Sequence, residues 1–183
     1  MINKLGCYLH AKQIPTPFCN ERPANSPVSL LVIHCISLPE GHYGGEAIEK
    51  LFTGCLDCAA DPRFADLKGL EVSAHCVIRR TGRVDQYVPF DKRAWHAGRS
   101  SFNGVVECND YAIGIELEGT DQTAFTEAQY QSLAALTRQI QQHYPAINKQ
   151  RIVAHSDIAP GRKTDPGSEF DWLYYFNLLS DGY

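Results

Sequence analysis

Two apolar, strand-like runs in this chain each end in a histidine, and a short polar loop after the second run carries an aspartate. The runs are Leu30 to His34 and Arg151 to His155, and the aspartate is Asp165. If the runs are neighbouring parallel strands, both imidazoles emerge at one edge of a sheet, where Asp165 can fold back to join them. Two histidines and one carboxylate form a zinc site whose fourth position is open to water, as in catalytic zinc sites. The spacing favours a metal-dependent hydrolase, but periodicity alone leaves ordinary polar strand ends equally open.

A third apolar run, Tyr111 to Gly119, supplies two carboxylates that could act beside a metal. Glu116 and Glu118 are two residues apart, so both project from the same face of a strand. A glutamate next to zinc can accept the proton of a bound water, whereas the alternative is a solvated strand face. The residues alone do not rank one glutamate above the other. Lys163, two residues before Asp165, could stabilise an oxyanion or be an ordinary surface lysine.

The remaining histidines and the cysteines have simpler explanations. His75 lies inside a predicted strand and is better explained as a hydrogen-bonded residue near the core than as a ligand. His96 lies in a long loop, where it suits substrate contact. Cys55 and Cys58 form a lone CxxC pair without a second pair, which favours incidental thiols over a redox or metal site. Seven cysteines without a visible signal-peptide pattern predict reduced thiols and a cytoplasmic location.

Composition excludes several kinds of partner. The 183 residues suffice for one domain with a full core, and the formal net charge is −4. This charge provides no basic footprint for nucleic acid and disfavours docking on anionic membranes or wall polymers. No apolar run approaches the roughly 20 residues needed to span a bilayer. We expect neither a nucleic-acid nor a membrane partner, and nothing in the pattern requires an oligomer.

The pattern of elements predicts an α/β fold: a single domain with a mixed central β-sheet flanked by helices. Residues 1–28 are expected to form an irregular N-terminal arm and residues 29–180 the catalytic domain. Thr126 and Gln129 form a capping box that starts the longest helix, which Pro145 closes, and Ser168 is expected to cap the final helix. The predicted strands are 29–37, 73–80, 83–88, 111–117 and 151–155, and the first short helix is 46–52.

Five segments together resemble the zinc N-acetylmuramoyl-L-alanine amidases of the phage-lysozyme and peptidoglycan-recognition-protein type. They are Val32 to His34, Val72 to Ile78, Ala94 to Gly98, Ile113 to Leu117 and His155 to Gly167. Within that family the resemblance is strongest to cytoplasmic amidases that act on anhydromuramyl peptides in cell-wall recycling. Tyr87 to Gly98, Cys108 to Asp110 and the chain length support this narrower match.

The resemblance implies a role for each matching residue. His34, His155 and Asp165 match the ligands of one zinc ion, Glu116 rather than Glu118 matches the catalytic carboxylate, and Lys163 matches the lysine that stabilises the transition state. Contacts to the substrate are expected from Trp95, His96, Ala97, His75 and Cys35.

The implied reaction is hydrolysis of the amide between anhydro-N-acetylmuramic acid and the L-alanine of a soluble anhydro-muropeptide. In the family this reaction also influences β-lactamase induction by muropeptides. Two other functions stay open, a muropeptide-binding module without catalysis and an amidase for intact cell wall. Two positions where the family has arginines for the stem peptide carry Glu71 and Glu107 here, so Arg79, Arg80, Arg99 or Arg162 would have to replace them.

Overall fold

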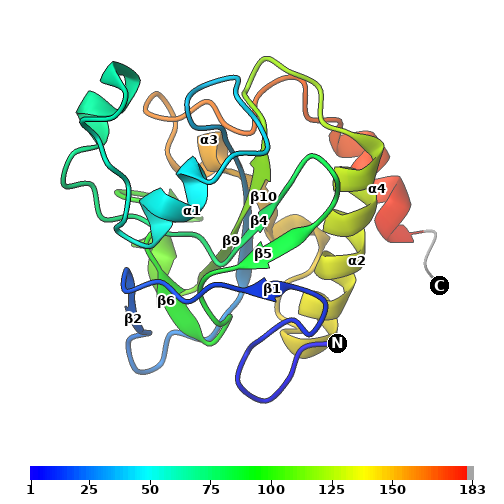
Figure 1. Cartoon of the computed structure of the whole chain (residues 1–183). Helices are drawn as coiled ribbons and strands as arrows, with labels where there is room; N and C mark the ends of the chain where they lie inside the picture. The colour runs from blue at the N-terminus through cyan, green and yellow to red at the C-terminus, as the bar shows by residue number, and fades with distance from the viewer. Residues whose placement is uncertain (181–183) are drawn as a thin grey trace.

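A mixed six-stranded sheet forms the centre of the computed structural model, which describes residues 1–180 (Figure 1). All neighbouring strands are parallel except β4 and β5, which form an antiparallel hairpin. The predicted mixed sheet is therefore confirmed. In spatial order its strands are β1 (Lys12–Gln13), β5 (Val84–Gln86), β4 (Cys76–Ile78), β9 (Ala112–Glu118), β3 (Leu30–Ile36) and β10 (Ile152–Ala154).

The alternation of side chains along β9 divides the sheet into an apolar face and a face that carries the polar residues. Ile113, Ile115 and Leu117 join the main hydrophobic core, so Gly114 and Glu116 must lie on the opposite face. Two helices, α2 (Glu127–His143) and α4 (Trp172–Ser180), pack together over the apolar face (Figure 1). The face opposite these two helices is left for the polar residues.

The predicted N-terminus of the longest helix is confirmed. The Thr126 side chain accepts from the Gln129 N–H, and the Gln129 side chain accepts from the Thr126 N–H. Each interaction satisfies a backbone donor that the helix itself leaves unpaired.

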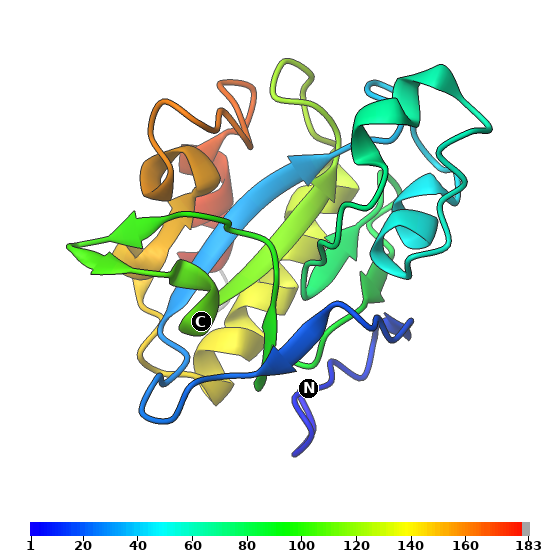
Figure 2. The same ribbon diagram turned by 90° about the vertical axis from the view of Figure 1, so that its left-hand side faces the viewer.

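Smaller elements surround the sheet and shape the ends of its strands. Figure 2 shows the β7–β8 hairpin projecting from the body of the molecule, at the left of the view. The smaller elements, in which η denotes a 3₁₀ helix, are β2 (Cys19–Glu21), α1 (Ala47–Phe52), η1 (Pro62–Leu67), β6 (Lys92–Ala94), β7 (Ser101–Phe102), β8 (Val105–Val106), η2 (Cys108–Asp110), η3 (Lys149–Arg151) and α3 (His155–Ile158).

The N-terminal segment and the last helix differ from the sequence-based expectations. The segment expected to be irregular contributes β1 to the edge of the main sheet and β2 to a pairing with β6. Such short strands carry no alternating pattern, because their strand character depends on the partner they meet. The last helix begins at Trp172 and not near Ser168, since the Asp171 side chain accepts from the Tyr174 N–H and caps it.

None of the helices within residues 1–180 is long and apolar enough to cross a membrane.

Candidate metal centre and active site

Three neighbouring strands bring His34, His155 and Glu116 to one end of the sheet. His34 lies near the end of β3 and pairs in register with Glu116 on β9. On the other side of β3, Ala154 of β10 pairs with Ile33, so His155 follows directly beside His34. The predicted parallel neighbourhood of the two histidine-bearing strands is confirmed.

The ligand cluster, defined as His34, His155 and Asp165, brings three potential metal ligands into mutual contact. The two Nδ1 atoms are 2.9 Å apart, and Asp165 Oδ2 lies 3.1 Å from the Nδ1 of His34 and 3.0 Å from that of His155. Ligand atoms of a tetrahedral zinc ion with bonds of about 2.0–2.1 Å are about 3.3 Å apart. The spacing in the cluster is slightly tighter than this, and one small cation fits its triangular geometry.

The chemistry of the cluster also fits a cation. His155 Nε2 lies 3.2 Å from the Ala97 carbonyl oxygen, to which it can only donate, so a ring that carries one proton presents an unprotonated Nδ1. Burial lowers the pKa of His34 to about 4, so this imidazole is neutral near pH 7. Asp165 adds a carboxylate oxygen 3.1 and 3.0 Å from the Nδ1 atoms of His34 and His155. Lone pairs and a negative charge therefore converge on one point.

The ligand cluster lines a cavity of about 300 Å³, and Glu116 lies in the wall of this cavity. Its Oε2 is buried and has no hydrogen-bond partner within residues 1–180. Burial and then the charge of Asp165 raise the pKa of Glu116 well above its usual value, and Lys163 opposes this shift. A buried carboxylate of raised pKa beside a metal site can take up a proton and release it again.

A sequence model of the family described as N-acetylmuramoyl-L-alanine amidase matches residues 24–168. The chain belongs to this amidase family. The expectation drawn from its motifs is thereby confirmed.

Known relatives cover almost the whole of this amidase. It is 53% identical over 180 residues to the 1,6-anhydro-N-acetylmuramyl-L-alanine amidase AmpD of Escherichia coli (strain K12), covering 98% of each chain. A crystal structure of a selenomethionine AmpD derivative superposes with a TM-score of 0.95 at 53% identity, covering 98% of this chain and 99% of that one.

A more distant structure contains a bound substrate. It is the complex of E. coli AmiD with anhydro-N-acetylmuramic acid-L-Ala-D-γ-Glu-L-Lys. Its TM-score is 0.61 at 32% identity, and the match covers 87% of this chain and 60% of that one.

Four further residues singled out in the sequence line the cavity of this amidase, namely Cys35, Trp95, His96 and Lys163. Trp95 donates from its indole N–H to Asn20 Oδ1, at 2.6 Å, which fixes its ring at the rim. Burial, followed by the charge of Glu116, raises the pKa of the Cys35 thiol far above its usual value, so this sulfur stays protonated. An apolar wall that sequence reasoning missed completes the cavity, formed by Leu38, Leu51, Phe52, Leu67, Leu70 and Val72.

His75 and Ala97, which we expected to contact substrate, do not line this cavity, and both are fully buried. His75 accepts from the Gly114 N–H and donates to the Lys92 carbonyl, which fits a structural histidine. The Ala97 carbonyl accepts from His155, so its contact is with a candidate ligand.

Two polar residues near the site were given no role by the sequence analysis. Asn109 accepts the backbone N–H groups of His96 and Ala97. Arg22 donates to the Asn109 and Asp110 carbonyls. Asn109 lies in the segment Cys108 to Asp110, which supported the family match without assigning it a role, and Arg22 belongs to no local pattern that would single it out.

Proposed function

We propose that this amidase is zinc-dependent and hydrolyses the amide between 1,6-anhydro-N-acetylmuramic acid and the L-alanine of the stem peptide. The observation that carries the proposal is the ligand cluster sharing one cavity with the unpartnered carboxylate of Glu116. His34 and His155, through Nδ1, and Asp165, through its carboxylate, would hold the ion. A purely binding module has no need of an unpaired buried base beside such a cluster.

Residues around the ligand cluster have different roles in the proposed amide hydrolysis. When bound, zinc would supply a Lewis acid that polarises a carbonyl and lowers the pKa of water to about 7. Glu116 accepts the proton of the attacking water and returns it to the departing L-alanine amine. The Lys163 ammonium stabilises the oxyanion that develops at the amide carbonyl, and one such donor is typically worth about 3–4 kcal/mol.

The choice of substrate is supported by the relatives and by the shape of the cavity. AmpD of E. coli is named for the 1,6-anhydro-N-acetylmuramyl-L-alanine amidase reaction, and AmiD has been crystallised with an anhydro-muropeptide. The apolar wall and Trp95 provide a surface on which a sugar ring can stack. We therefore propose soluble anhydro-muropeptides as substrates and, from the likeness to AmpD, a role in cytoplasmic recycling of wall fragments.

The test is product analysis with a defined anhydro-N-acetylmuramyl tripeptide. Metal-free enzyme, prepared with a chelator and then supplied with one equivalent of zinc, should release anhydro-N-acetylmuramic acid and an intact tripeptide with a free L-alanine amine. Liquid chromatography with mass spectrometry identifies both products. The metal-free enzyme and Glu116→Gln are the controls and should release little of either.

Three outcomes would contradict the proposal. Cleavage at full rate without metal would contradict the proposed zinc dependence. Binding of the muropeptide without any product would favour a binding module. Faster release from polymeric sacculus than from the soluble tripeptide would favour an enzyme for intact wall.

A further inference from the structure

Residues 96 and 97 provide one hydrogen-bond acceptor for each histidine of the ligand cluster. The Ala97 carbonyl oxygen lies 3.2 Å from His155 Nε2, and His96 Nδ1 lies 2.9 Å from His34 Nε2. If both histidines bind a metal through Nδ1, each must carry its proton on Nε2 and donate it. The two acceptors therefore select the tautomer and the ring orientation that metal binding needs.

The His96 ring has little other polar role. Its Nε2 is buried without a partner within residues 1–180, so its polar contact in the described chain is the one with His34. The ring also packs closely over the backbone of β9. A Cβ atom placed on Gly114 would lie 2.4 Å from His96 Cγ, so only glycine at this position lets the ring reach His34.

A single side chain holds both acceptors in place. Asn109 Oδ1 accepts the His96 N–H at 3.1 Å and the Ala97 N–H at 2.8 Å. Only the amide oxygen can face two N–H donors, so the orientation of this amide is unambiguous. Asn109 is 6% exposed, and water therefore does not readily replace this oxygen.

The segment that carries Asn109 is itself anchored. Arg22 donates to the Asn109 and Asp110 carbonyls at 3.1 and 3.0 Å and to the Ala112 carbonyl at 2.9 Å. On the other side, Arg162 donates to the Ala97 carbonyl at 2.7 Å. The acceptors behind the two histidines thus belong to a rigid network, and Asn109 contacts both of their backbone N–H groups.

We infer that Asn109 is a positioning residue for the metal centre. Its side-chain oxygen fixes residues 96 and 97, which in turn fix the tautomers and ring planes of His34 and His155. Asn109 therefore sets the affinity of the site for zinc without touching the metal or the substrate. This inference rests on the proposed zinc dependence and goes beyond it by naming the residue on which the strength of binding depends.

The experiment measures zinc affinity directly, by competition between the metal-free full chain and a chromophoric chelator. Asn109→Leu is nearly isosteric but offers no acceptor, and loss of such support for ligands typically weakens metal binding by about 10–100-fold. Asn109→Asp retains an oxygen that accepts both N–H groups and should bind zinc nearly as tightly as the parent. A second readout is the visible absorption of the cobalt-substituted protein, which should change in Asn109→Leu and not in Asn109→Asp.

Two controls separate positioning from general damage. Gln129→Leu removes a buried amide that donates to the Ile78 and Glu118 carbonyls, away from the metal, and should leave zinc affinity unchanged. Asn109→Ala replaces Asn109→Leu if the latter does not fold, as judged by circular dichroism. Folded variants without the acceptor that bind zinc like the parent, or an equal loss in Asn109→Asp, would overturn the inference. A parent protein that binds no zinc would instead overturn the proposed function.

Discussion

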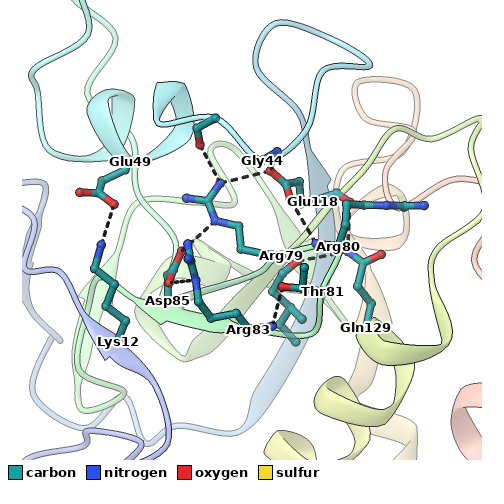
Figure 3. Close-up of polar contacts among 12 residues, drawn as sticks. Lys12, Gly44, Glu49, Arg79, Arg80, Thr81, Arg83, Asp85, Glu118 and Gln129 are labelled. Carbon is teal, nitrogen blue, oxygen red and sulfur yellow. Dashed lines mark hydrogen bonds and ion pairs between the residues drawn. The ribbon is translucent and has the colours of Figure 1, made fainter.

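Two carboxylates on the same face of β9, only two residues apart, lie in opposite electrostatic environments. Glu118 accepts from Arg79 Nη1 at 3.2 Å, from the Gly44 N–H at 2.8 Å and from the Arg80 N–H at 3.1 Å (Figure 3). Within residues 1–180, Oε2 of the buried Glu116 has no partner. Both residues are buried, and they differ in the number of hydrogen-bond donors that face their carboxylates.

The same contrast applies to the two clusters beside these glutamates, the ligand cluster next to Glu116 and a second cluster that contains Glu118. In the arginine cluster, defined as Arg79, Asp85 and Glu118, Arg79 lies between the two carboxylates, and Asp85 is also paired with Arg83 (Figure 3). In the ligand cluster, lone pairs and a carboxylate face one another and need a cation. Buried charges that have all their hydrogen-bond and ion-pair partners stabilise the fold. Buried polar groups that lack partners mark a site where a ligand or a proton supplies the missing partner.

The largest expected effect is the loss of the metal from a variant of the ligand cluster. His155→Ala removes one of three ligands, so bound zinc should fall from about one equivalent to near zero, together with activity. Metal analysis of purified, dialysed protein measures this. Glu118→Gln, altered in the arginine cluster, should keep its zinc. Full zinc retention by His155→Ala would show that the ligand set is wrong.

The next effect separates catalysis from metal binding within β9. Glu116→Gln keeps the shape of the side chain but removes the base, so turnover should fall by ~10²-fold or more while zinc stays bound. Glu118→Gln should turn over at a rate close to the parent's, because its carboxylate contacts backbone and Arg79 only. Steady-state kinetics on a soluble anhydro-muropeptide gives both rates, and the reverse ranking would contradict the assignment.

A third effect concerns the free energy of unfolding, for which we expect a change in the arginine cluster to matter more than a change at Glu116. Arg79→Met leaves Asp85 and Glu118 buried with fewer partners and should cost about 3–5 kcal/mol in the free energy of unfolding. For a chain of this size each kcal/mol lowers Tm by about 2–4 °C. Urea unfolding of the metal-free proteins measures it, since bound zinc would add a stabilisation that depends on the affinity of each variant. Glu116→Gln should be no less stable than the parent; an Arg79→Met protein of parental stability would mean that the arginine cluster contributes nothing net.

The smallest effect concerns the far end of the substrate. Glu71 and Glu107 are exposed, and Glu107 lies 3.7 Å from Arg93. Because both residues are acidic, neither can form an ion pair with a peptide carboxylate. We expect kcat/KM to differ little between stem peptides whose diaminopimelate carboxylate is free and those in which it is amidated. A large preference for the free acid would point to Arg99 and Arg162, which line a separate cavity of about 240 Å³.

The sequence predicted the elements whose signals are local. The runs before His34 and His155 and the capping box at Thr126 were identified correctly, because a continuous apolar run and capping chemistry lie within a few neighbouring residues. His34 and His155 were proposed from strand ends for the same reason, and Asp165 from the polar loop after the second run. Folding brings the three within about 3 Å of one another.

The different environments of Glu116 and Glu118 were decided only by the tertiary structure. Spacing placed both on one face, and only the family resemblance favoured Glu116. The donors that neutralise Glu118 come from positions 44, 79 and 80, which no local pattern connects to β9. Likewise, Asn109 acquires its importance from backbone groups twelve and thirteen residues away. Sequence periodicity determines which face a side chain occupies, but the partners that set its charge and chemistry come from distant segments, and only folding brings these together.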